Sequence, residues 1–85
     1  MKYAVILTRS ARKDLLTLEQ TLRERVMKVI DQLIQNPWPR GIQKLVGRED
    51  SWRIRIGTHR VVYSVFQGTQ TVKIQRIRHR REAYR

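Results

Sequence analysis

The sequence predicts an α+β fold in one small domain, with the element order β-α-α-β-β-β. Apolar residues recur at helical spacing through residues 10–35, and they alternate with polar residues in short stretches from residue 51 onward. A chain of 85 residues leaves room for one domain. We therefore expect residues 1–85 to form a two-layer sandwich, in which two N-terminal helices cover one face of an antiparallel sheet.

A strand followed by a helix is predicted at the N-terminus. Residues 1–8 alternate as a β-strand does, with Tyr3, Val5 and Leu7 on one face. Ser10 is a predicted helix N-cap, because its hydroxyl can accept a hydrogen bond from a free amide of the first turn. The apolar residues that follow have the spacing of one helix face: Ala11, Leu15, Leu18 and Leu22.

A second helix is predicted over the residues up to 35. Thr21 and Glu24 have the spacing of a capping box, so we expect the first helix to break near residues 19–21. Asn36 and Pro37 end the second helix, because proline cannot continue a helix and restricts the residue before it. A loop is expected from there to about residue 50. The apolar positions of this helix are Leu22, Val26, Val29, Ile30, Leu33 and Ile34.

Three consecutive strands are predicted in the C-terminal half, as an antiparallel meander. Residues 51–57 alternate strictly, residues 59–66 form the next strand, and a short turn at 67–69 leads to the last one. The last strand carries Val72 and Ile74 inward, but the next apolar residue, Ile77, is out of phase with them. One extra residue near Gln75 and Arg76 therefore predicts a β-bulge.

The charge of the chain is large and uneven. Nineteen Lys and Arg against seven Asp and Glu give a net charge of +12, and residues 40–85 alone hold twelve basic and three acidic side chains. Such a field attracts phosphate backbones, so we expect contact with nucleic acid or the ribosome. An acidic protein partner suits the same field. A merely solubilising surface is the alternative, but solubility does not need this much charge.

Several other functions find no support in the sequence. The chain has no cysteine, and its only neighbouring carboxylates are Glu49 and Asp50, so neither a metal site nor a cofactor is expected. Phosphate-binding glycine motifs are absent. No apolar run approaches the length of a membrane span, and we expect a soluble, cytoplasmic protein without membrane contact.

Arginines on the polar face of the predicted sheet are the main candidates for function. Arg53 and Arg55 lie two apart and share a face, and Arg60 has the matching parity on the next strand. Arg80 follows the bulge and can bend back toward them. Converging guanidiniums form a phosphate cradle, and Tyr84 could stack on an RNA base. For any one of these arginines, a solvated sheet face is the alternative.

A series of short motifs runs along nearly the whole chain. Ala11 and residues 13–15 (Lys-Asp-Leu) lie in the first helix, and Pro37 precedes a G-x-x-K-L-x-G loop at residues 41–47. Residues 52–57 (Trp-Arg-Ile-Arg-Ile-Gly), 60–63 (Arg-Val-Val-Tyr) and 77–81 (Ile-Arg-His-Arg-Arg) follow, with Tyr84 after them. In this order and spacing the motifs resemble the RelE/ParE toxin superfamily of bacterial and archaeal type II toxin–antitoxin systems.

The resemblance implies the β-α-α-β-β-β fold and one of two activities. RelE-like members are metal-free endoribonucleases, or mRNA interferases, that cut messenger RNA in the ribosomal A site and so inhibit translation. The RNA 2′-hydroxyl attacks the neighbouring phosphate and leaves a 2′,3′-cyclic phosphate. ParE-like members share the fold but poison DNA gyrase. We favour the RelE-like branch; the alternatives are a ParE-like toxin and a degenerate toxin that binds only antitoxin or nucleic acid.

The resemblance also implies partners. Members of both branches are silenced by a cognate antitoxin, a small protein encoded in the same operon that is often acidic or partly disordered. The toxin–antitoxin complex commonly represses that operon, so contact with operator DNA is expected only through the complex. The ribosome and messenger RNA are the expected targets of a RelE-like member.

By position, the resemblance assigns roles to five residues. Arg53 and Arg55 fall where RelE-like ribonucleases stabilise the transition state and activate the 2′-hydroxyl. Arg60 falls on the arginine that holds the phosphate, and Arg80 on the one beside the leaving group. Tyr84 falls near the tyrosine that stacks on the substrate base, although the spacer from Arg80 is short here.

One position departs from the pattern. The ribosome-dependent branch has a lysine assigned as general base where this chain has Arg55, and a guanidinium is effectively never deprotonated. His79 is the substitute base to test, because imidazole is the side chain that most often acts as a general base. Further basic residues are expected to bind RNA: Lys44, Arg48, Arg76, Arg78 and Arg81.

Overall fold

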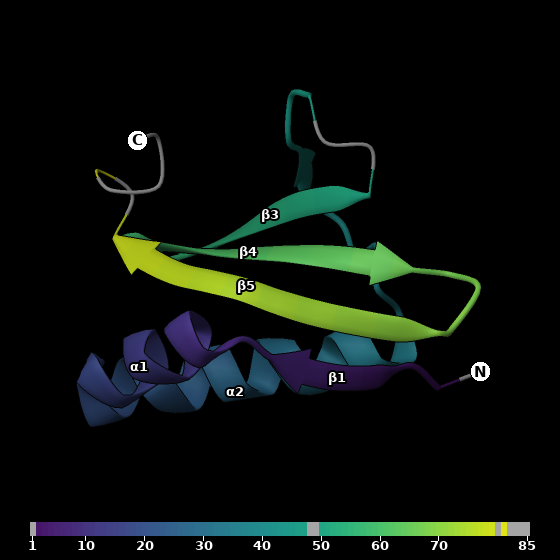
Figure 1. Ribbon diagram of the computed structural model, residues 1–85. Helices are drawn as coiled ribbons and strands as arrows, with labels where there is room; N and C mark the ends of the chain where they lie inside the picture. The colour runs from purple at the N-terminus through teal and green to yellow at the C-terminus, as the bar shows by residue number, and fades with distance from the viewer. Residues whose placement is uncertain (1, 48–49, 80, 82–85) are drawn as a thin grey trace.

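The computed structural model describes residues 2–47, 50–79 and 81, and it confirms the predicted fold class. Two helices lie against one face of a sheet (Figure 1). In chain order, the elements are β1 (Ala4–Leu7), α1 (Arg9–Thr17), α2 (Gln20–Gln35), β2 (Gln43–Lys44), β3 (Ser51–Ile56), β4 (His59–Phe66) and β5 (Thr71–His79).

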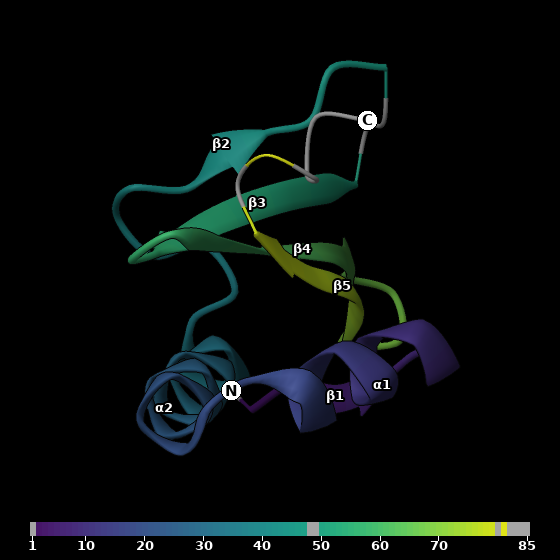
Figure 2. The same ribbon diagram turned by 90° about the vertical axis from the view of Figure 1, so that its left-hand side faces the viewer.

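The sheet has five strands in the order β1-β5-β4-β3-β2. Strands β3, β4 and β5 form the antiparallel meander that the sequence predicts. The first strand joins it as a parallel neighbour of β5, which places the N-terminus at one edge. The expectation of a plain loop over residues 41–50 was wrong in part: the two-residue β2 pairs antiparallel with β3 and forms the other edge (Figure 2).

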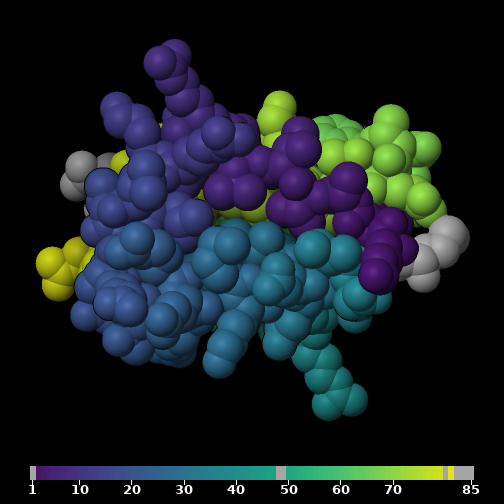
Figure 3. Space-filling view, turned by 90° about the horizontal axis from the view of Figure 1, so that it is seen from below, coloured from purple at the N-terminus to yellow at the C-terminus, as the bar shows by residue number. Residues whose placement is uncertain are grey.

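The core lies between the helices and the sheet. One side of α2 packs inward through Val26, Ile30 and Leu33, whose spacing of four and three follows the helix period. The alternate residues Val61, Tyr63 and Val65 of β4 meet them from the sheet. Seen from the helix side, the N-terminal half of the chain, coloured purple to blue, forms most of the visible surface (Figure 3). Across the described residues, no helix has the length and apolar composition needed to span a membrane.

The predicted break between the two helices is confirmed, because α1 ends at Thr17 and α2 begins at Gln20, but the predicted capping residues were wrong. Thr8, not Ser10, is the N-cap of α1: its Oγ1 accepts a hydrogen bond from the Ala11 amide at 3.0 Å. The second helix begins at Gln20, with Glu19 as N-cap and no side-chain cap, so Thr21 does not form a capping box. With α2 starting at Gln20, only Leu18 and Glu19 separate the two helices, and Leu18 is buried in the core.

The predicted β-bulge is confirmed in β5. Ile74 pairs with Tyr63 and Arg76 with Val62, which leaves Gln75 as the extra residue. The pairing of β5 with β1 stops at the bulge, because β1 ends at Leu7 opposite Ile74. The segment around α1 takes that place: Thr8 Oγ1 donates to the Gln75 carbonyl at 2.8 Å.

Candidate nucleic-acid interface

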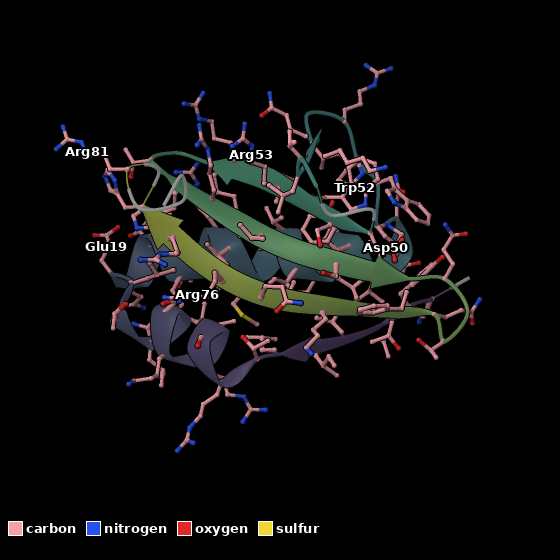
Figure 4. All side chains as sticks on the ribbon, turned by 45° about the horizontal axis from the view of Figure 1, so that its top comes forward. Glu19, Asp50, Trp52, Arg53, Arg76 and Arg81 are labelled. Carbon is pink, nitrogen blue, oxygen red and sulfur yellow. The ribbon has the colours of Figure 1, made fainter. Side chains whose placement is uncertain are left out.

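Three predicted arginines line one pocket on the sheet face that is turned away from the helices. Arg53 and Arg55 extend from β3, and Arg60 extends from β4. The pocket has a volume of about 150 Å³, and Gly41 and Gln43 complete its wall. Figure 4 shows Arg53 on this open face. The volume holds several water molecules, which is enough room for a phosphate group.

Strand register places the arginines in a row. Arg55 lies directly opposite Arg60 on β3 and β4, and Arg60 lies opposite Arg78 on β5. Arg60 is 8% exposed, so its stem lies at the floor of the pocket while Arg55 remains exposed at the rim. Adjacent guanidiniums on three strands make a strongly positive strip, with planar donors suited to phosphate oxygens. Arg78 therefore extends the predicted cradle.

The edge strand β2 orients Arg53. Gln43 is the cross-strand partner of Arg53, and its Oε1 accepts hydrogen bonds from Arg53 Nε, at 2.9 Å, and from Arg53 Nη2. One carbonyl oxygen thereby fixes the plane of the guanidinium. Gln43 was not among the predicted site residues, because a strand of two residues carries no periodic signal.

A buried tyrosine connects the core to this wall of the pocket. Tyr63 is fully buried, and its hydroxyl donates to the Pro37 carbonyl at 2.7 Å. Burial raises the pKa of Tyr63 above its ordinary value, so the hydroxyl keeps the proton that it donates. The contact ties down the segment that follows α2. That segment turns at Gly41, whose φ of +87° suits glycine, and then enters β2.

Arg76 is drawn away from the open face, toward α1. Its Nε and Nη2 donate to the two carboxylate oxygens of Asp14 at 2.8 and 3.2 Å, and the Ile77 amide donates to the same carboxylate at 2.9 Å. Burial raises the pKa of Asp14, but the hydrogen bonds from Arg76 and Ile77 and the charges of Arg76 and Arg78 outweigh it and hold the pKa below its ordinary value. Figure 4 shows Arg76 on the α1 side of β5.

Two further predicted residues lie on the helix side of the sheet. His79 is opposite His59 on β4, in register with Ile56 and Val61 rather than with the arginines, and the two imidazole rings are 5.3 Å apart. Lys44 pairs with Trp52, and its Nζ lies 5.8 Å from the centre of the Trp52 ring. The structure does not bring either side chain to the arginine pocket.

The remaining predicted residues lie at the margins of the described structure. Arg81 is exposed just after β5 (Figure 4). Arg48, Arg80 and Tyr84 lie outside the described residues. Among residues 2–47, 50–79 and 81, no three His, Asp or Glu side chains come together as a potential metal site.

Known proteins are similar to this chain in sequence and in fold. Residues 5–84 match the family described as the ParE toxin of the type II toxin-antitoxin system, parDE. A curated protein of Methanocaldococcus jannaschii with the name RelE1 is 32% identical over all of this chain and 98% of its own length.

Two solved complexes contain close structural matches. The RelE–RelB complex of Pyrococcus horikoshii OT3 matches with a TM-score of 0.84 and 32% identity, over 94% of this chain and 97% of the matched one. The RelBE2 complex of Mycobacterium tuberculosis matches with a TM-score of 0.80 and 30% identity, over 93% and 99%.

Proposed function

The chain belongs to the RelE/ParE superfamily of toxins from type II toxin–antitoxin systems, and from this we propose that it is a metal-independent, ribosome-dependent messenger RNA endoribonuclease. The observation that carries the proposal is the pocket that Arg53, Arg55 and Arg60 line together. Cleavage of an RNA phosphodiester develops negative charge on the phosphate, and preorganised guanidiniums stabilise that charge.

The reaction is an internal transfer. The 2′-hydroxyl oxygen attacks the adjacent phosphorus, the bond to the 5′-oxygen breaks, and the products are a 2′,3′-cyclic phosphate and a 5′-hydroxyl. Arg60, at the floor of the pocket, holds the phosphate, while Arg53 and Arg55 stabilise the transition state. We assign Arg80 to the leaving 5′-oxygen and Tyr84 to base stacking; both lie outside the described residues.

The physiological partner of such a toxin is a cognate antitoxin, and the complexes with RelB among its relatives support this assignment. We propose an acidic chain that covers the open arginine face and so blocks access of RNA to it. Its affinity weakens only in part with salt, because apolar contacts remain. Translation as the target places the protein in the cytoplasm, and contact with operator DNA occurs through the toxin–antitoxin complex.

Single-turnover cleavage on programmed ribosomes tests the proposal. Arg60→Ala should lower the rate by roughly 10²–10³-fold, as expected for the loss of one preorganised donor. Arg12→Ala removes the same charge from the exposed side of α1 and should leave the rate unchanged. Chelation of transition-metal ions, at a Mg²⁺ concentration that keeps the ribosome intact, should have no effect, because side chains stabilise the charge. Full activity in both Arg60→Ala and Arg80→Ala would refute the arginine cradle.

A second function is favoured by the family that residues 5–84 match, which is described by its ParE toxin. In that case the target is DNA gyrase, and the arginine face binds protein or DNA. Expression without antitoxin separates the two: new messenger RNA ends at ribosome-occupied codons indicate the endoribonuclease, whereas intact messages with gyrase-dependent DNA breaks indicate the gyrase poison.

A further inference from the structure

Two arginines of the sheet are held by acceptors of different charge. Arg53 donates through Nε and Nη2 to the neutral amide oxygen of Gln43. Arg76 donates through the same pair of nitrogens to the carboxylate of Asp14. Arg53 lines the pocket, whereas Arg76 is turned toward α1.

The charge of the acceptor determines how strongly the guanidinium can still attract an anion. A carboxylate satisfies the donors of an arginine and also cancels its positive charge, so the pair attracts an anion weakly. An amide oxygen fixes the same donors and leaves the positive charge intact. Gln43 therefore orients Arg53 without lowering the field in the pocket, whereas a glutamate at the same position would lower it.

We propose that Gln43 is a positioning residue of the arginine pocket, and that its neutrality is required for the pocket to bind a phosphate anion. This rests on the proposed function, in which the pocket receives an RNA phosphate. Gln43 acts through Arg53 and needs no contact of its own with the phosphate. Pairing of β2 with β3 supplies the register, since it sets Gln43 directly opposite Arg53.

The surroundings of Gln43 support a role in the site rather than in folding. Gln43 is exposed on an edge strand of two residues, and it contributes nothing to the buried core. A substitution there leaves the packing of α2 against β4 untouched. Surface substitutions of this kind change stability by about 0.5 kcal/mol or less, so functional effects can be measured on a folded chain.

Titration of the full-length chain with inorganic phosphate, followed through the Arg53 Nε–H signal by NMR, tests the proposal without any cleavage assay. Gln43→Glu should weaken phosphate binding by at least about tenfold, because a negative charge enters the pocket wall. Gln67→Glu makes the same change in net charge on the exposed β4–β5 turn and should match the wild type within about twofold. Equal affinities of the two glutamate variants would overturn the proposal.

A double-mutant cycle on cleavage tests whether Gln43 acts through Arg53. Gln43→Ala alone should slow cleavage by roughly tenfold relative to the wild type, because a displaced Arg53 guanidinium stabilises the transition state less well. In the Arg53→Ala background it should have no further effect. Additive losses would overturn the positioning role.

The salt dependence of RNA binding should also fall, with a slope smaller by about 1 for Gln43→Glu and unchanged for Gln67→Glu.

The two proposals fail in different ways. If phosphate binding depends on the residue at position 43 but messenger RNA is not cleaved, the positioning role stands and the proposed ribonuclease does not. If cleavage occurs but all variants at position 43 match their controls, the ribonuclease stands and the positioning role does not.

Discussion

Loss of the Asp14 carboxylate should destabilise the fold more than loss of the arginine that it binds. Asp14 accepts from the Arg76 guanidinium and from the Ile77 amide, past the point where β1 stops covering the edge of β5. Asp14→Ala removes both contacts and leaves the Ile77 amide without this acceptor. Arg76→Ala removes the ion pair with Asp14 and leaves the contact between Asp14 and the Ile77 amide in place.

The two contacts differ in size because they differ in exposure. The side chain of Arg76 is 40% exposed, so its pair with Asp14 contributes at most about 1 kcal/mol. A part-buried amide that loses its acceptor costs about 1–3 kcal/mol. Asp14→Ala should therefore lower the free energy of unfolding by about 1.5–4 kcal/mol, and Arg76→Ala by about 0.5–1 kcal/mol. Asp14→Asn keeps an oxygen for the Ile77 amide and should resemble Arg76→Ala.

Equilibrium urea unfolding measures these differences as shifts in midpoint at constant slope. Asp31→Ala, which removes an exposed carboxylate from α2, is the matched control and should change stability by about 0.5 kcal/mol or less. Because the pKa of Asp14 is lowered in the folded chain, the difference between wild type and Asp14→Asn is fully present at pH values above the pKa that this carboxyl has in the unfolded chain. It should disappear as the pH falls through the folded-state pKa. A larger loss in Arg76→Ala than in Asp14→Ala would refute the reasoning.

Two further predictions follow from buried and paired side chains. His79→Gln should leave the rate and pH profile of cleavage unchanged within about twofold, because His79 faces away from the arginines; a loss of roughly 10²–10⁴-fold would identify it as the general base. Tyr63→Phe should lower the free energy of unfolding by about 1 kcal/mol in urea unfolding, because the Pro37 carbonyl loses its donor; unchanged stability would mean that this hydrogen bond does not anchor the segment before β2.

The periodicity of the sequence was sufficient to predict which strand residues share a face of the sheet and where the β-bulge lies. The parity of Arg53, Arg55 and Arg60 placed all three on the open face, and the phase change before Ile77 located the extra residue at Gln75. Both conclusions depend only on the alternation of side chains along a strand, which is a local property.

Contacts between distant parts of the chain could not be predicted in this way. Asp14 and Arg76 are separated by 62 positions, and no pattern in either segment indicates that they meet. Thr8 caps α1 because it also reaches β5, a tertiary reason that favours it over Ser10. The Gln43 contact depends on a strand too short to show alternation.

The row formed by Arg55, Arg60 and Arg78 sets selection for stability against selection for function. Like charges on directly opposed strand positions destabilise a sheet, and this row repeats that arrangement across three strands. A library screened for heat resistance alone will therefore favour neutral residues in the row, and its survivors will be stable proteins without toxicity. Only a screen that keeps a polyanion present rewards the native residues, because a bound anion stabilises the folded chain that holds it.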